Sequence, residues 1–174
     1  GLVATSIDPD FLAQVGRGLP SVLVSGTNGK TTTTNLLMRI IAASGQSVIL
    51  NGEGSNLARG IASTLLTSPL DRASIGTFEV DEAELITVSR ALQPKLVILL
   101  NLFRDQMDRY GELDATARKW HALEKLPSTD LIMNVDDPNL GWLATQIKSP
   151  ITFGIDSVIG EQRGQSLTLS HTAD

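Results

Sequence analysis

Short apolar runs alternate with segments of helical character along most of this 174-residue chain. The runs are apolar throughout rather than at every second position, which is typical of strands covered on both faces. Repeated strand, helix, strand order favours right-handed crossovers and a parallel sheet. The sequence therefore predicts an α/β fold with a doubly wound, mostly parallel sheet. The expected strands span residues 21–25, 47–51, 75–80, 95–101, 131–135 and 151–154, and the expected helices span 31–44, 57–67, 82–92, 114–125 and 138–146.

The turn after the first expected strand has the composition of a phosphate-binding loop. It reads Gly-Thr-Asn-Gly-Lys-Thr-Thr over residues 26–32. Its glycines allow a tight turn in which main-chain N–H groups approach an anion, and the following helix directs its positive dipole end there. Lys30 would neutralise phosphate charge, and the Thr31 hydroxyl would coordinate Mg²⁺. The predicted nucleotide-binding residues are Gly26, Thr27, Asn28, Gly29, Lys30, Thr31 and Thr32.

A plain strand-to-helix turn with a surface lysine is the competing interpretation of this loop. Val24 stands where the general P-loop pattern has its first glycine, so the match is to a shortened variant. The apolar strand before the loop and the helix after it are the context that the motif requires. We therefore expect the loop to bind phosphate.

Acidic residues follow the third expected strand. In parallel sheets, ligands bind outside the carboxyl ends of the strands, where such residues gather. Glu79 ends this strand, and a carboxylate beside a phosphate loop can hold Mg²⁺ directly or through water. The alternative is a surface acidic turn that starts the next helix, and Glu82 and Glu84 are interpreted in that way.

Two further loops follow strands and contain candidate functional residues. Residues 101–111 read Asn-Leu-Phe-Arg-Asp-Gln-Met-Asp-Arg-Tyr-Gly, which could form a transfer site around Asp105 and Arg109 or a network of surface ion pairs. Residues 51–56 read Asn-Gly-Glu-Gly-Ser-Asn and end at Asn56. Their two glycines fit either a flexible turn or a backbone that approaches a ligand.

Composition limits the classes of function. A net charge of −5 argues against a broad surface for nucleic acid, and the absence of cysteine excludes disulfides and thiolate metal sites within these residues. No apolar stretch approaches the length of a membrane span, and no signal peptide is visible. We expect a single domain over residues 1–174 and a cytoplasmic location.

Four motifs together resemble the Mur ligases, in order and in spacing. They are the loop at 26–32, the Phe-Glu-Val-Asp segment at 78–81, the Asp-Gln-Met-Asp-Arg-Tyr segment at 105–110 and the Asn-Val-Asp-Asp turn at 134–137. The resemblance implies a central ATP-binding domain that uses ATP and Mg²⁺ for carbon–nitrogen ligation. A C-terminal domain that completes the ATP site in these ligases would lie beyond residue 174.

Within this superfamily, residues 51–56 and 101–112 look most like the MurT type, the ATP-using subunits of lipid II isoglutaminyl synthase. That resemblance implies a glutamine amidotransferase partner of the GatD type and lipid II as a membrane-borne substrate. ATP would phosphorylate the α-carboxyl of D-glutamate, and ammonia from the partner would convert it to D-isoglutamine. The implied catalytic residues are Lys30, Glu79, Asp105 and Arg109, with Thr31 and Glu79 on the metal and Asn56 near the acceptor carboxylate.

Departures from the family pattern narrow these expectations. Gln106 replaces a histidine that many Mur ligases use at a second metal, and His121 falls where they place a carbamylated lysine. We therefore do not expect that second metal site, and residues 1–174 contain no cysteine for the four-cysteine zinc ribbon that MurT-type proteins often carry. An amino-acid-adding Mur ligase, a folylpolyglutamate synthase-like enzyme and a nucleotide-binding scaffold without turnover remain alternative functions.

Overall fold

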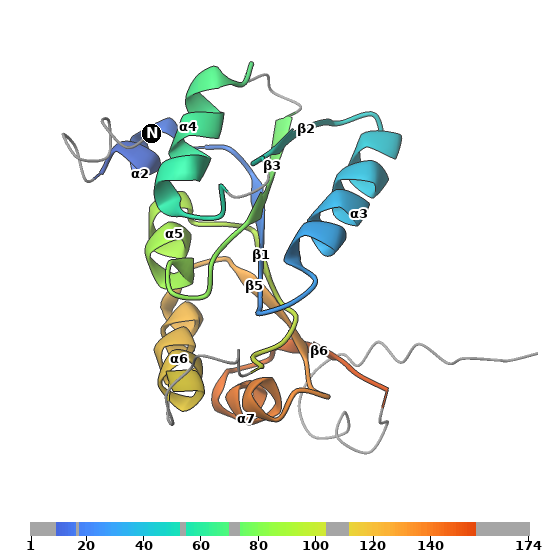
Figure 1. Cartoon of the computed structure of the whole chain (residues 1–174), viewed down its shortest axis with the longest axis vertical. Coiled ribbons are helices and arrows are strands. Elements are labelled where there is room, and N and C mark those ends of the chain that lie inside the picture. Colours follow the sequence, from blue (N-terminus) through green and yellow to red (C-terminus); the bar gives the residue numbers. More distant parts are fainter. Residues whose placement is uncertain (1–9, 17, 53–54, 70–73, 104–111, 156–174) are drawn as a thin grey trace, which may run out of the picture.

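A computed structural model of the chain describes residues 10–16, 18–52, 55–69, 74–103 and 112–155 (Figure 1). Six parallel strands form one sheet in the order β2-β3-β1-β4-β5-β6, which confirms the α/β prediction. The strands are β1 (Ser21–Ser25), β2 (Ser47–Leu50), β3 (Ser74–Glu79), β4 (Leu96–Leu99), β5 (Asp130–Asn134) and β6 (Ile151–Phe153). The helices are α2 (Phe11–Val15), α3 (Lys30–Ala43), α4 (Ala58–Thr67), α5 (Leu85–Leu92), α6 (Glu112–Trp120) and α7 (Pro138–Gln146), with a 3-10 segment η1 (His121–Lys125).

The strand order determines which face of the sheet each helix covers. The chain moves one way along the sheet from β1 to β2 and the opposite way at every later step. Because crossovers between parallel strands are right-handed, a reversal of direction places the connecting helix on the opposite face. Figure 1 shows this result, with α3 on one side of the sheet and α4, α5 and α6 on the other.

The hydrophobic core lies between the sheet and the larger group of helices. Phe78, Leu23, Val97 and Leu131 are register partners across four neighbouring strands, and all four are buried. They pack in one cluster with buried side chains of α4, α5, α6 and α7. Burial of this many large apolar side chains is the main favourable term in the stability of such a domain.

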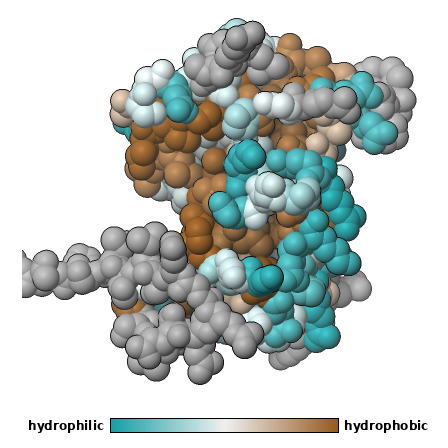
Figure 2. Space-filling model, turned by 180° about the vertical axis from the view of Figure 1, so that it is seen from behind, coloured by the Kyte–Doolittle hydropathy of each residue, from teal (hydrophilic) through white to brown (hydrophobic). Residues whose placement is uncertain are grey.

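Helix α3 buries less of its apolar stripe than the sequence predicts. Within α3, whose residues are all described, Thr34 alone is fully buried, while Leu36 and Ile40 are 57% and 67% exposed. Figure 2, which views the molecule from behind, shows hydrophobic surface on the side where α3 lies. The sheet beneath α3 is nevertheless covered at its centre, since Val24, Thr77 and Ile98 on this face are buried, and the exposed apolar residues of α3 lie on its outer side.

Local sequence signals mark the end of α3 and the start of α7. Gly45 follows α3 with a φ of 84°, and the buried Asp137 caps α7 by accepting bonds from the N–H groups of Asn139 and Leu140. The predicted helix 114–125 instead ends as an α-helix at Trp120 and continues as η1. None of the helices in the described ranges is long and apolar enough to span a bilayer.

Candidate functional site

The carboxyl end of β1 is the point where the chain connections diverge. The helix that follows β1 covers one face, whereas the helices that follow its neighbours β3 and β4 cover the other. Such a divergence opens a crevice at the strand ends, which is where α/β sheets bind ligands. The loop at 26–29 lies there, between β1 and the start of α3. The predicted phosphate loop therefore lies where this fold binds ligands.

The two glycines of the loop adopt backbone conformations that other residues rarely take. Gly26 has a φ of 141° and Gly29, at the N-cap of α3, has a φ of 85°. A Cβ atom on Gly26 would lie 2.9 Å from both the N and the O atom of Asn101. The loop and the segment after β4 thus approach one another at backbone distance, and the first N–H groups of α3 remain available at its exposed start.

Substitution of Gly26 tests this close approach. Gly26→Ala is expected to lower the free energy of unfolding by about 2–4 kcal/mol, because it adds strain at a positive φ to a steric conflict with the Asn101 backbone. Gly45→Ala is the matched control: Gly45 also has a positive φ, of 84°, but a Cβ atom there would meet nothing within 4 Å. Urea denaturation of both variants measures the difference. Equal losses would show that the Asn101 segment moves aside without cost.

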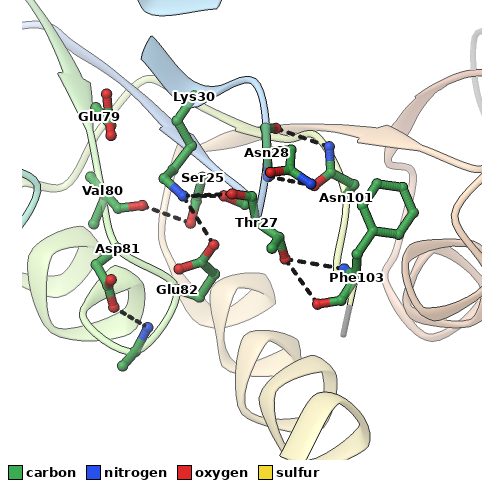
Figure 3. A network of polar contacts seen from close by, with 12 residues as sticks. Ser25, Thr27, Asn28, Lys30, Glu79, Val80, Asp81, Glu82, Asn101 and Phe103 are labelled. Atoms are coloured by element: carbon green, nitrogen blue, oxygen red, sulfur yellow. Dashed lines mark hydrogen bonds and ion pairs between the residues drawn. The ribbon is translucent and has the colours of Figure 1, made fainter. Parts of the chain in front are cut away.

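The ammonium group of Lys30 is turned into the loop rather than toward solvent (Figure 3). Nζ donates hydrogen bonds to the carbonyl oxygens of Gly26 and Thr27, the latter at 3.2 Å. It also forms an ion pair with Glu82 Oε1 at 3.1 Å, and the Lys30 side chain is only 12% exposed. The loop lysine is therefore held in place by contacts within the chain before any phosphate arrives.

The ion pair corrects the interpretation of Glu82 as an ordinary surface residue. Its side chain is 24% exposed and its backbone oxygen accepts a hydrogen bond of 3.1 Å from Nε1 of the buried Trp120. Glu84 behaves differently, since its carboxylate faces the N–H of Ala58 at 3.4 Å. The two acids are two positions apart in sequence, so composition alone did not distinguish them.

Thr31 and Glu79 are brought together as the sequence predicted. The Thr31 hydroxyl donates to Glu79 Oε2 at 2.6 Å across the ends of β1 and β3. The buried Asn51 fixes the Glu79 backbone: its amide nitrogen donates to Glu79 O and its amide oxygen accepts from Glu79 N, both at 2.9 Å. Asn51 is thus a positioning residue that the sequence prediction did not single out.

The segment after β4 braces the other side of the loop. Asn101 bonds through its side-chain amide to both the N and the O atom of Asn28, at 2.8 and 3.0 Å. The Thr27 hydroxyl exchanges hydrogen bonds with the backbone of Phe103, and Asp137 Oδ2 accepts from Leu102 N at 2.7 Å. These contacts order the loop without a ligand, which reduces the entropy lost on binding.

The remaining predicted residues are not all placed. The Asn56 backbone oxygen accepts from Asp81 N at 2.9 Å, which puts this residue at the same edge of the sheet as Glu79. Within the described ranges its side chain makes no hydrogen bond. Asp105, Gln106 and Arg109 lie outside the described residues.

The donor set at the loop suits magnesium bound together with a polyphosphate. A hydroxyl and a carboxylate oxygen, Thr31 Oγ1 and Glu79 Oε2, already lie 2.6 Å apart. Mg²⁺ keeps several waters and takes only one or two protein ligands when phosphates supply the rest. No cluster of three or more metal-binding side chains occurs among the described residues, so this pair could hold the ion only with phosphate and water as further ligands.

Comparisons with known proteins agree with this geometry. Residues 24–173 match the family described as "Mur ligase middle domain". The chain is 39% identical over 160 residues to the "Lipid II isoglutaminyl synthase (glutamine-hydrolyzing) subunit MurT" of Streptococcus pneumoniae. The matched region covers 90% of the chain and 35% of that protein. The same subunit of Staphylococcus aureus strain COL is 32% identical over 156 residues, which cover 89% of the chain and 36% of that protein.

Similarities extend to other ligases. A UDP-N-acetylmuramoylalanine–D-glutamate ligase of Desulfotalea psychrophila is 36% identical over 121 residues, which cover 68% of the chain and 25% of that enzyme. Among solved structures, MurF from Acinetobacter baumannii superposes with a TM-score of 0.69 at 18% identity, over 83% of the chain and 33% of that structure. The chain spans about a third of the length of the MurT proteins it matches. The chain belongs to the Mur ligase family, and residues 24–173 correspond to the family's middle domain.

Proposed function

We propose that this chain is the nucleotide-binding middle domain of an ATP-dependent amide ligase subunit of the MurT type. The complete enzyme amidates the α-carboxyl of the D-glutamate in lipid II to D-isoglutamine, with ammonia from a glutamine amidotransferase partner of the GatD type. It acts in the cytoplasm during peptidoglycan synthesis. The observation that carries the proposal is the convergence of Lys30, Thr31 and Glu79 at the end of β1, in a chain 39% identical to a MurT subunit.

The loop residues would bind and orient the triphosphate. Helix α3 presents N–H groups and the positive end of its dipole to the phosphates, and the Lys30 ammonium adds a full positive charge. Mg²⁺, when held by Thr31 and Glu79, would neutralise charge on the phosphate oxygens. Asn51, directly after β2, holds the Glu79 backbone at the end of β3, and the Glu79 carboxylate accepts from the Thr31 hydroxyl.

The reaction requires two successive transfers. An oxygen of the acceptor carboxylate attacks the γ-phosphorus while the bond to the β–γ bridging oxygen breaks, giving an acyl phosphate and ADP. Ammonia then attacks the acyl carbon, loses a proton and expels inorganic phosphate, leaving the amide. Positive groups fixed at the loop stabilise the charge that develops on the transferring phosphoryl group. Asp105, Arg109 and Asn56 are proposed to lie near the acceptor carboxylate.

An amino-acid-adding ligase is the main rival, favoured by the 36% identity to a UDP-N-acetylmuramoylalanine–D-glutamate ligase. The nucleophile separates the two functions. We expect the full-length protein, supplied with ATP, Mg²⁺ and a D-glutamate-containing acceptor, to form product with ammonia or with glutamine plus the partner. Free amino acids in place of ammonia should give no product. Mass spectrometry of the product measures this, and amino-acid addition without amidation would overturn the proposal.

A further inference from the structure

We propose that Glu82 is a competing counter-ion for the loop lysine, and that the nucleotide's phosphate displaces it. In the nucleotide-free protein the Glu82 carboxylate holds the Lys30 ammonium in the loop, and a bound polyphosphate takes its place. This inference rests on the proposed function, because it concerns the same loop. It adds a residue that sets how tightly, and how selectively, the loop binds a charged phosphate chain.

The first argument is the number of donors on Lys30. A lysine ammonium has three N–H donors and no acceptor. All three have partners here: the carbonyl oxygens of Gly26 and Thr27, and Glu82 Oε1 at 3.1 Å. A phosphate oxygen can therefore bond to Nζ only by displacing one of the three.

The second argument identifies which partner leaves. The two carbonyls belong to a braced backbone, since Thr27 N donates to Asn101 O at 3.1 Å and Gly26 lies against the same residue. Glu82 contributes a side chain that can change rotamer. Its charge has the same sign as phosphate, so an arriving nucleotide repels it at short range. Displacement of the carboxylate leaves Nζ bonded to both loop carbonyls, whereas loss of a carbonyl bond requires the loop backbone or the Lys30 side chain itself to move.

The third argument is that the surroundings provide the carboxylate with a second position. A cavity of about 440 Å³ lies beside α5 and α6, and its lining includes Glu82 together with Arg90, Arg118 and Lys119. The displaced carboxylate can turn toward these cations. The hydrogen bond from Trp120 Nε1 to Glu82 O keeps the backbone in place, so that the side chain can return when the nucleotide leaves.

The neighbouring acids do not share this role. Glu79 accepts from the Thr31 hydroxyl, and the Glu84 carboxylate faces the backbone of Ala58. Glu84 therefore offers a matched control: it lies two positions from Glu82, has the same charge and does not contact Lys30. Glu82→Gln retains the size of the side chain and an oxygen acceptor but removes the charge that competes with phosphate.

The test is calorimetric titration of the intact protein with Mg·ATP and, separately, with adenosine. Glu82→Gln is expected to lower the Kd for Mg·ATP about three- to tenfold, since an ion pair of this exposure is worth about 1 kcal/mol. Its Kd for adenosine should stay as in the wild type, because adenosine carries no phosphate. Glu84→Gln should change the Kd for Mg·ATP less than about twofold. A second variant, Glu82→Ala, should also lower the Kd for Mg·ATP.

The outcomes separate this inference from the proposed function. Wild-type protein that binds Mg·ATP while both Glu82 variants bind it equally or more weakly would overturn the counter-ion exchange and leave the function standing. Equal gains in the Glu82 and Glu84 variants would also overturn it, because they would reflect net charge rather than the contact with Lys30. Wild-type protein that binds no Mg·ATP would overturn the proposed function and the exchange together.

Discussion

Lys30→Ala is expected to abolish ATP-dependent amide formation, lowering kcat by at least about a hundredfold. The substitution removes the positive charge that the loop aims at the transferring phosphoryl group, and residues 26–32 contain no other cationic side chain. It also leaves Glu82 without its partner at 3.1 Å, so that an unneutralised carboxylate faces the incoming phosphate. Both consequences act in the same direction. Amide formation by the full-length protein with its glutaminase partner measures the effect.

The loss should reflect chemistry rather than unfolding. The Lys30 side chain is 12% exposed and has three hydrogen-bond partners, so Lys30→Ala is expected to lower the free energy of unfolding by about 1–3 kcal/mol, which shifts the urea midpoint but leaves the protein folded in the assay. Lys95→Ala is the matched control, because Lys95 is exposed and directly precedes β4. It therefore lies at the amino ends of the parallel strands, whereas the loop lies at their carboxyl ends. That variant should retain full turnover. Undiminished turnover of Lys30→Ala would contradict the proposed mechanism.

Local sequence signals were sufficient to predict the six strands, the loop and the helices from α3 to α7, but they did not predict α2. The strand 21–25 was predicted at its observed bounds, because a short apolar run between turn residues leaves little choice of period. Thr31 and Glu79 were both predicted to hold Mg²⁺ because both lie at the carboxyl ends of strands, and their side chains are in contact. These predictions depend on spacing along the chain and on one rule of parallel sheets.

Strand order was not accessible in the same way. Periodicity predicts six strands but not that β1 lies between β3 and β4. That order sends a single crossover to one face, which leaves Leu36 and Ile40 exposed although they belong to an apolar stripe. The apolar stripe of α3 would be the same for any strand order. Its burial depends on which other elements pack on that face of the sheet.

Side-chain pairs distant in sequence were the other missed feature. Lys30 and Glu82 are 52 positions apart, and nothing in the spacing of the Glu-Val-Asp-Glu segment shows which carboxylate turns toward the loop. Asn51 was similarly read as the first residue of a glycine-containing turn, whereas its amide pairs with both backbone groups of Glu79. An asparagine directly after an apolar strand was the available sequence signal.

Glu79→Gln is expected to lower turnover about a hundredfold and to raise the Mg²⁺ concentration needed for half-maximal activity. The amide keeps the shape of the side chain and can still accept the hydrogen bond that Thr31 now donates at 2.6 Å. It lacks the negative charge that attracts a hard divalent cation. The substitution therefore separates the structural contact from metal binding. Turnover measured across a Mg²⁺ titration, at saturating ATP, gives both quantities.

Glu84→Gln is again the control, since it removes one negative charge from the same loop without touching Thr31. It should leave the Mg²⁺ dependence unchanged. Partial recovery of the Glu79→Gln variant at high Mg²⁺ would identify the defect as weakened metal binding, because mass action restores occupancy of a weakened site. Glu79→Gln and Glu82→Gln should then change nucleotide binding in opposite directions: the first removes a charge that attracts the metal, and the second removes one that repels phosphate. If both substitutions raised the Mg·ATP affinity, or both lowered it, the separate roles proposed for the two carboxylates, metal binding for Glu79 and competition with phosphate for Glu82, would be contradicted.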